Sequence, residues 1–154
     1  MVDKQQVAAM SFHETLSHQH RNCDIALAGV EQEAIDGRWS DAERAFNNFL
    51  ALTEDHFTYE EQVLFPALQQ ANPMTAQPVS VMQSDHTQIR ELAADLQIAL
   101  QERRRDLLQG ASETLVFLLQ QHNAKEESVL YPIADQLLDP QELPIQQSPH
   151  DGDN

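Results

Sequence analysis

The chain has 154 residues, which suits one domain with a sizeable hydrophobic core. Its 25 acidic and 9 basic side chains give a formal net charge of −16, which argues against nucleic acid or an anionic membrane as a partner, because both attract basic surfaces. No apolar run is long enough to cross a bilayer or to form the core of a signal peptide, and the single cysteine, Cys23, cannot form an intramolecular disulfide. We therefore expect a cytoplasmic protein in a reducing compartment.

A first helix is expected from Ser11 to the residue before Gly37. Ser11 and Glu14 have the spacing of a capping box, in which two side chains satisfy backbone N–H groups at the start of a helix. Apolar residues then recur every three or four positions, as on the buried face of an amphipathic helix. His20 falls on this apolar face.

A second helix is expected to begin at another capping box, Ser40 with Glu43, and to end before Asn72. His56 and Glu60 lie on its apolar face. Residues four apart in an α-helix are separated by about 40° around its axis, so this imidazole and this carboxylate point the same way. One helix can thus offer two ligands to a transition metal.

Residues 72–78 are predicted to form the longest loop. A third helix then extends from about Val79 to Gly110, which is expected to end it in the left-handed conformation. His86 lies on the apolar face of this helix. A fourth helix follows, and from residue 139 the chain is rich in Pro, Gln and Asp without periodicity, as is typical of a tail.

The second half of the chain repeats the first at an offset of 66 residues. The matched positions are His20, His56, Glu60, Glu61, Leu64 and Pro66 with His86, His122, Glu126, Glu127, Leu130 and Pro132, in that order. Each half is therefore predicted to be a helical hairpin, and short connections favour antiparallel packing. We predict an all-α fold: an up-down-up-down antiparallel four-helix bundle of residues 1–138, internally duplicated, with a C-terminal tail at 139–154.

Two matched prolines, Pro66 and Pro132, lie inside predicted helices. Proline has no backbone N–H group and its ring clashes with the preceding turn. Each helix is therefore expected to kink or shorten at its proline.

Six polar residues are predicted to meet inside the bundle. They lie on apolar faces, where a histidine or glutamate needs a partner, and the repeat implies a pseudo-two-fold axis that brings them to one point: His20, His56, Glu60, His86, His122 and Glu126. Four imidazoles are too many nitrogens for Mg²⁺ or Ca²⁺, and six ligands are too many for one tetrahedral Zn²⁺. The set suits two first-row metal ions bridged by the carboxylates, with iron as the best candidate. The alternative is a buried polar cluster held by hydrogen bonds alone, which the repeated His-x-x-x-Glu spacing disfavours.

Three further residues are candidates for a place beside the metals. Asp24 and Arg90 match each other in the repeat, one turn past His20 and His86, and we hypothesise that they form an ion pair across the bundle. The alternative is that each side chain extends to solvent. Cys23, one turn after His20, is either a small core residue or a redox-active thiol able to react with nitrosylated iron.

Glu61 and Glu127 each follow one of the two clustered glutamates by a single residue, so they point about 100° away from it. We interpret them as surface or interhelical partners, with a carboxylate route for incoming iron as the alternative. The sequence indicates no role for Tyr59 and Trp39 other than packing in the core or capping a helix.

The pattern resembles the hemerythrin-like family, named for its His-His-Glu cation-binding motif. The resemblance covers residues 11–138: a histidine in helix one, His-x-x-x-Glu in helix two, a histidine in helix three and His-x-x-x-Glu in helix four. It implies a non-haem di-iron centre with an oxo, hydroxo or water bridge. The implied ligands are His20 and His56 for one iron, His86 and His122 for the other, and Glu60 and Glu126 as bridges.

The ligand set departs from that of the invertebrate oxygen carriers. In those proteins a third histidine stands where this chain has Arg90, and an aspartate where it has Glu126. The set is more similar to that of bacterial di-iron proteins linked to repair of iron–sulfur centres under nitric oxide or peroxide stress. Those proteins usually carry an extra cysteine-bearing domain, for which we find no room in this chain.

The expected function is that of a non-haem di-iron protein that binds or handles O₂, NO or peroxide at a carboxylate-bridged iron pair. Binding or sensing is favoured over catalysis. The alternatives are an enzyme or iron donor in oxidative or nitrosative stress and iron–sulfur cluster repair, and an iron-storage bundle. The sequence does not identify a protein partner.

Overall fold

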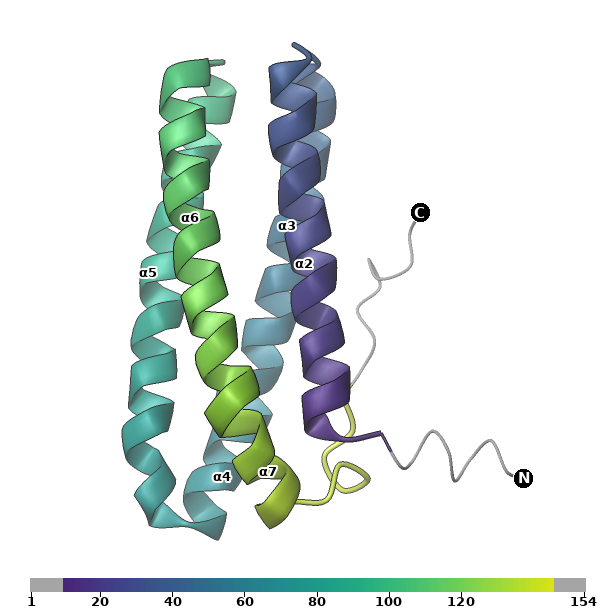
Figure 1. The fold of residues 1–154 in the computed structure, drawn as a ribbon, viewed down its shortest axis with the longest axis vertical. Helices are drawn as coiled ribbons and strands as arrows, with labels where there is room; N and C mark the ends of the chain where they lie inside the picture. The colour runs from purple at the N-terminus through teal and green to yellow at the C-terminus, as the bar shows by residue number, and fades with distance from the viewer. Residues whose placement is uncertain (1–9, 146–154) are drawn as a thin grey trace, which may run out of the picture.

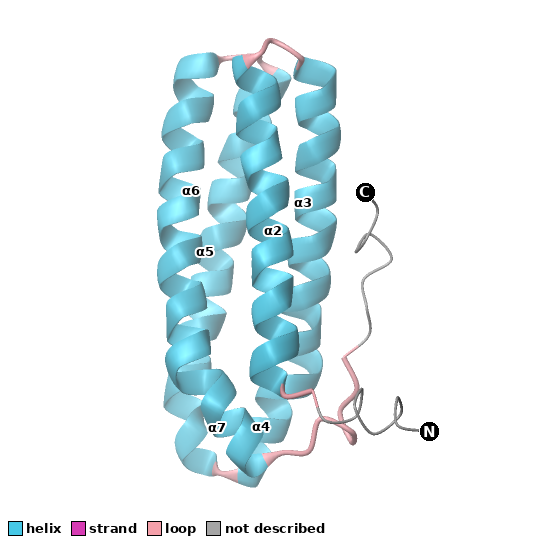
Figure 2. Ribbon diagram, turned by 45° about the vertical axis from the view of Figure 1, so that its right-hand side comes forward, coloured by secondary structure: helices cyan, strands magenta, loops and turns pink. Residues whose placement is uncertain are grey.

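The computed structural model describes residues 10–145, and these form an all-α bundle of four helical rods (Figures 1 and 2). The first and third rods are each one helix, α2 (Phe12–Ile35) and α5 (Ala76–Gln101). The second rod is α3 (Trp39–Tyr59), η1 (Glu60–Leu64) and α4 (Phe65–Ala71), and a short turn, η2 (Pro73–Thr75), joins it to α5. The fourth rod is α6 (Arg105–Lys125), η3 (Glu126–Leu130) and α7 (Tyr131–Leu137). The connections between rods alternate between the two ends of the bundle (Figure 2).

The first helix begins and ends as predicted. The Ser11 hydroxyl accepts a hydrogen bond from the Glu14 N–H group at 3.0 Å, and the Glu14 carboxylate accepts one from the Ser11 N–H group at 3.1 Å, which completes a capping box. Gly37 follows the helix with a φ of 77°, a conformation that glycine adopts without steric cost.

The second predicted capping box is wrong. Helix α3 begins at Trp39, one residue before Ser40, and its first residues have no side-chain cap. The turn before it is held instead by Arg38, whose guanidinium binds the carboxylates of Glu33 at 2.7 Å and Asp36 at 2.9 Å. Ser40 is therefore already inside the helix and cannot cap it.

The predicted ends of the third helix are also wrong. Helix α5 ends at Gln101, and the turn that follows contains Arg103 with a φ of 55°. Gly110 lies inside α6, so it does not end a helix. The loop predicted at 72–78 is shorter, because Pro73–Thr75 forms a turn of helix and α5 already begins at Ala76.

The two internal prolines follow wide π-helical turns, η1 and η3. The N–H group of Phe65 bonds to the carbonyl of Glu60, and that of Tyr131 to the carbonyl of Glu126, so each bond spans five residues instead of four. Such a turn accommodates the carbonyls that the following proline leaves unpaired. A π-helical turn also brings the residue five positions after its first residue back to the same face of the helix. It therefore places Phe65 on the face of Glu60, and Tyr131 on the face of Glu126.

Two apolar clusters fill the bundle on either side of the polar residues. The larger contains Phe46, Phe49 and Leu96, and it includes Cys23, which is 7% exposed. The smaller, which includes Phe12 and fully buried Tyr131, lies at the other end. The six polar residues therefore lie in an interior that excludes water.

The first residues of the predicted tail contact the bundle. Leu143 and Ile145 pack against the smaller cluster, and the Tyr59 hydroxyl donates to the Leu143 carbonyl at 2.7 Å. The remainder of the tail lies outside the described residues. Within the described part of the chain, no helix has the length and apolar character needed to cross a membrane.

Candidate metal centre

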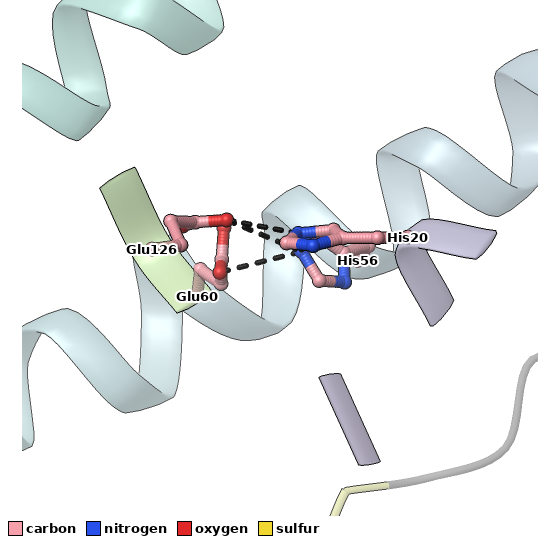
Figure 3. A group of neighbouring side chains, drawn as sticks. All are labelled: His20, His56, Glu60 and Glu126. Carbon is pink, nitrogen blue, oxygen red and sulfur yellow. Dashed lines mark hydrogen bonds and ion pairs between the residues drawn. The ribbon is translucent and has the colours of Figure 1, made fainter. Parts of the chain in front are cut away.

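The six residues singled out by the repeat lie together at the centre of the bundle, and all are at most 4% exposed. They come from every rod: His20 from α2, His56 and Glu60 from α3 and η1, His86 from α5, and His122 and Glu126 from α6 and η3. Figure 3 shows four of them pointing toward one another. The prediction that these side chains meet is therefore confirmed.

Two overlapping groups within the cluster have the spacing of metal ligands. We name position A the group His20, His56, Glu60 and Glu126, and position B the group His86, His122, Glu60 and Glu126. In each group one ligand atom per residue lies within 4.8 Å of all the others. The two glutamates belong to both positions, as carboxylates that bridge two cations would.

The closest approaches at both positions join imidazole Nε2 atoms and carboxylate oxygens. At position A, His20 Nε2 is 3.1 Å from His56 Nε2 and 3.0 Å from Glu126 Oε1, and His56 Nε2 is 3.3 Å from Glu60 Oε2. At position B, His86 Nε2 is 3.1 Å from Glu60 Oε1, and His122 Nε2 is 3.2 Å from Glu126 Oε1. Two ligands at right angles on one ion are separated by a similar distance, about 3 Å for metal–ligand bonds near 2.1 Å.

Four of these buried atoms have no hydrogen-bond partner: Glu60 Oε1, Glu126 Oε2, His86 Nε2 and His122 Nε2. Together they comprise both imidazoles of position B and one oxygen of each bridging carboxylate. Unpaired buried polar atoms are costly, and native proteins rarely keep several in one place. A metal cation would satisfy all four atoms, so the residues fit a metal ion.

Each imidazole is oriented through its other nitrogen. The Nδ1 atoms of His20 and His86 bind the carboxylates of Glu127 and Glu61, both at 2.7 Å. Those of His56 and His122 bind Gln19 at 2.8 Å and Asp85 at 2.9 Å. An N–H group donated at Nδ1 leaves the lone pair at Nε2, directed into the centre.

The repeat extends to these orienting residues. Glu61 matches Glu127 and Gln19 matches Asp85 at the same offset of 66 residues. Glu61 and Glu127 are therefore interhelical partners, as the sequence indicated, and each also holds a histidine. Gln19 and Asp85 were missed, although each directly precedes a histidine of the repeated pattern. Their positions around the helix gave no indication that they reach a neighbouring rod.

Replacement of Glu127 by glutamine is expected to weaken metal binding by about 10- to 100-fold, because His20 loses the charged partner that fixes its orientation and basicity. Titration with Co²⁺, followed by absorption, measures the affinity. Glu43→Gln, an exposed change on α3, is the matched control and should leave the affinity unchanged. Equal affinities for both variants would show that Glu127 does not support the centre.

The ion pair predicted between Arg90 and Asp24 is not formed. The Arg90 guanidinium binds the carboxylates of Glu54 and Glu61, both at 2.9 Å, whereas Asp24 lies exposed on α2. Arg90 also lies over the Phe57 ring, with its guanidinium carbon 5.1 Å from the ring centroid. Arg90 is therefore linked to the metal centre indirectly, because the Glu61 carboxylate that it binds also binds His86.

Two aromatic residues shield position B from water. The Phe57 ring stacks on the His86 imidazole with centroids 3.7 Å apart and planes at 12°. Phe65 lies on the same imidazole, at 5.8 Å between centroids. His86 is consequently fully buried.

The structure also brings into the site a residue that the sequence reasoning missed, Tyr131. Its hydroxyl group lies among the ligand atoms of position A: 2.6 Å from Glu60 Oε2, 2.8 Å from Glu126 Oε1, 3.1 Å from His20 Nε2 and 3.2 Å from His56 Nε2. Regular α-helical spacing would turn a residue five positions after Glu126 away from the site. The wide turn η3 brings it back.

The carboxylates control the proton affinity of the histidines. Burial alone lowers the pKa of His122, but the negative charge of Glu126, aided by Glu60 and by the hydrogen bond to Asp85, outweighs burial and raises that pKa to about 9. Glu60 and Glu126 likewise raise the pKa of His56 well above its ordinary value against the effect of burial. Protons and a metal cation therefore compete for the same nitrogens.

The stabilisation conferred by a metal is expected to grow as pH rises from 6.5 to about 9. Because folding raises the pKa of His122, its protonation stabilises the metal-free chain fully below pH 6.5, and this contribution is lost as pH rises through about 9. Metal binding displaces such protons, so affinity should rise up to about tenfold per pH unit for each proton displaced. The measurement is the melting temperature with and without Co²⁺ across this range; a difference independent of pH would contradict the expectation.

Comparison with known proteins bears on the same residues. The family model described as the hemerythrin HHE cation binding domain matches residues 11–134, from the first capping box to α7. No curated protein and no solved structure matches the chain. The match spans most of the chain, and the buried histidine and glutamate groups lie within it. The chain is therefore a metal-binding protein that belongs to the hemerythrin HHE cation-binding domain family.

Proposed function

We propose that this protein is a non-haem di-iron protein whose iron pair binds a small molecule such as O₂, NO or peroxide. The observation that carries the proposal is the pair of four-residue groups that share Glu60 and Glu126. Two imidazoles and one oxygen from each of two bridging carboxylates would hold each ion. Iron bound there would supply a redox-active centre with a coordination position for the small molecule.

The protein's own residues support this function in three ways. The Nδ1 partners hold the imidazoles with Nε2 facing inward. Phe57 and Phe65 cover the imidazole of His86, and the two apolar clusters above and below exclude water from the centre. A dry interior suits a neutral diatomic molecule and protects the centre from hydrolytic side reactions.

The donor set favours iron over the other common cations. Four imidazoles exclude the all-oxygen environment that Mg²⁺ and Ca²⁺ prefer, and two shared carboxylates exceed what a single tetrahedral Zn²⁺ requires. Imidazole with carboxylate is a usual environment for non-haem iron.

Metal analysis after anaerobic loading with Fe²⁺ tests the proposal. Two irons per chain are expected, together with a near-ultraviolet charge-transfer band after oxidation that changes when NO is added. One zinc or one iron per chain, at saturation, would contradict a paired centre. Sustained consumption of peroxide or NO would identify an enzyme, whereas a single stoichiometric change would identify a binding or sensing protein.

A further inference from the structure

The two metal positions are alike in their histidines but differ in one residue. Tyr131, beside position A, matches Phe65 in the repeat, and Phe65 lies on His86 of position B. We propose that the phenol oxygen of Tyr131 is a fifth protein ligand of the metal at position A, and that the exogenous molecule binds at position B. This inference rests on the proposed dinuclear centre and deepens it.

The first support is the spacing of the Tyr131 oxygen. It lies 2.6 to 3.2 Å from all four donor atoms of position A. Ligands at right angles on one ion are about 3 Å apart, so an atom with this spacing to four donors has the separation expected of a further ligand of the same ion.

The second support is the distribution of unpaired atoms. At position A, the phenol group is within hydrogen-bond distance of both imidazole nitrogens and of one oxygen from each glutamate. At position B the two imidazole nitrogens lie near carboxylate oxygens only, at 3.1 and 3.2 Å, and no assigned hydrogen bond satisfies them. Phe65, the matching residue, has no donor or acceptor to offer. A metal at position B would therefore have no protein ligand equivalent to the phenol, and that place is left to an exogenous molecule.

The third support is the burial of the phenol. Tyr131 is fully buried, and its ring belongs to the smaller apolar cluster. A buried tyrosine hydroxyl needs one partner, and a backbone carbonyl would suffice, as it does for Tyr59. The hydroxyl of Tyr131 is instead directed at metal-binding atoms from three other residues as well as at Glu126 on its own rod.

Coordination is the binding of a deprotonated phenol to a Lewis acid, without electron transfer. The bond between the Tyr131 oxygen and its hydrogen breaks, the bond from that oxygen to iron(III) forms, and the proton is released to the buffer. Iron remains iron(III) throughout. The phenolate keeps the bonding electron pair and shares it with the metal.

The test uses the full chain loaded with iron(III). The chain has only two tyrosines, so a phenolate-to-iron charge-transfer band, with tyrosine ring vibrations in its resonance Raman spectrum, arises from Tyr131 or Tyr59. We expect this band in the wild type, its loss in Tyr131→Phe and its retention in Tyr59→Phe. Tyr131→Phe removes one oxygen atom and creates the residue already present at the matching position, so two irons should still bind.

A reciprocal variant tests where the exogenous molecule binds, with azide as the probe. Phe65→Tyr would add a phenol beside position B, and we expect loss of azide binding together with a stronger phenolate band. Unchanged azide binding in that variant would overturn the assignment of position B. Two bound irons in the wild type without a phenolate band, or a band that persists in Tyr131→Phe, would overturn the proposal for Tyr131 alone. Fewer than two irons in the wild type would overturn the dinuclear centre itself.

Discussion

Replacement of Glu60 or Glu126 by glutamine is expected to abolish binding of both metal ions at once. Each carboxylate belongs to both positions, so a single change removes one anionic ligand from each metal and the negative charge between them. Loss of one orienting partner outside the ligand set already costs about 10- to 100-fold in affinity, so loss of a shared ligand should cost at least about 100-fold. Metal analysis after dialysis measures the outcome directly.

The control for this experiment is Glu91→Gln, an equivalent change on the exposed face of α5, which should retain both ions. Circular dichroism separates loss of metal from loss of fold, because glutamine keeps the size of the side chain. Loss of bound metal should also lower the melting temperature, since a ligand present at about 100 times its dissociation constant contributes about 2.7 kcal/mol. Retention of one ion in either variant would show that the two positions do not share that carboxylate.

Replacement of Phe57 by alanine is expected to destabilise the fold by about 3–5 kcal/mol. The ring is 2% exposed and contacts both the His86 imidazole and the Arg90 guanidinium, so its removal leaves a cavity against a candidate metal ligand. A domain of this size loses about 2–4 °C in melting temperature per kcal/mol. Denaturant unfolding of the metal-free chain measures the free energy of unfolding without a contribution from bound metal.

The chain offers a matched control in Phe117, which is 56% exposed on α6. Phe117→Ala should change the free energy of unfolding by no more than about 0.5 kcal/mol. Phe57→Ala should additionally weaken metal binding at position B, because His86 loses the ring that fixes its plane. A similar cost for the two alanine variants would mean that the stacking on His86 is not part of what holds the bundle together.

The polar cluster could be predicted without the structure for two reasons. Its residues recur at one offset in the two halves of the chain, and their spacing places them on the apolar faces of the predicted helices. A histidine or glutamate on an apolar stripe must be buried, and six such residues at matched positions in two halves can only meet at the axis between them. Local signals were less reliable at the helix ends. Gly110 has a residue type that often ends helices, but it lies within α6, because the turn forms at Arg103 in spite of its unfavourable φ.

The amino-acid sequence by itself determined the all-α class, the duplicated hairpin and which six side chains converge, because all three follow from the spacing of residues along a helix. The tertiary structure alone decided the contacts that depend on rods packing against each other: Gln19 and Asp85 on the histidines of neighbouring rods, and Arg90 on Glu54 and Glu61 instead of Asp24. It also decided the position of Tyr131. The π-helical turn before this residue interrupts the regular α-helical spacing, so the direction of its side chain could not be inferred from the sequence.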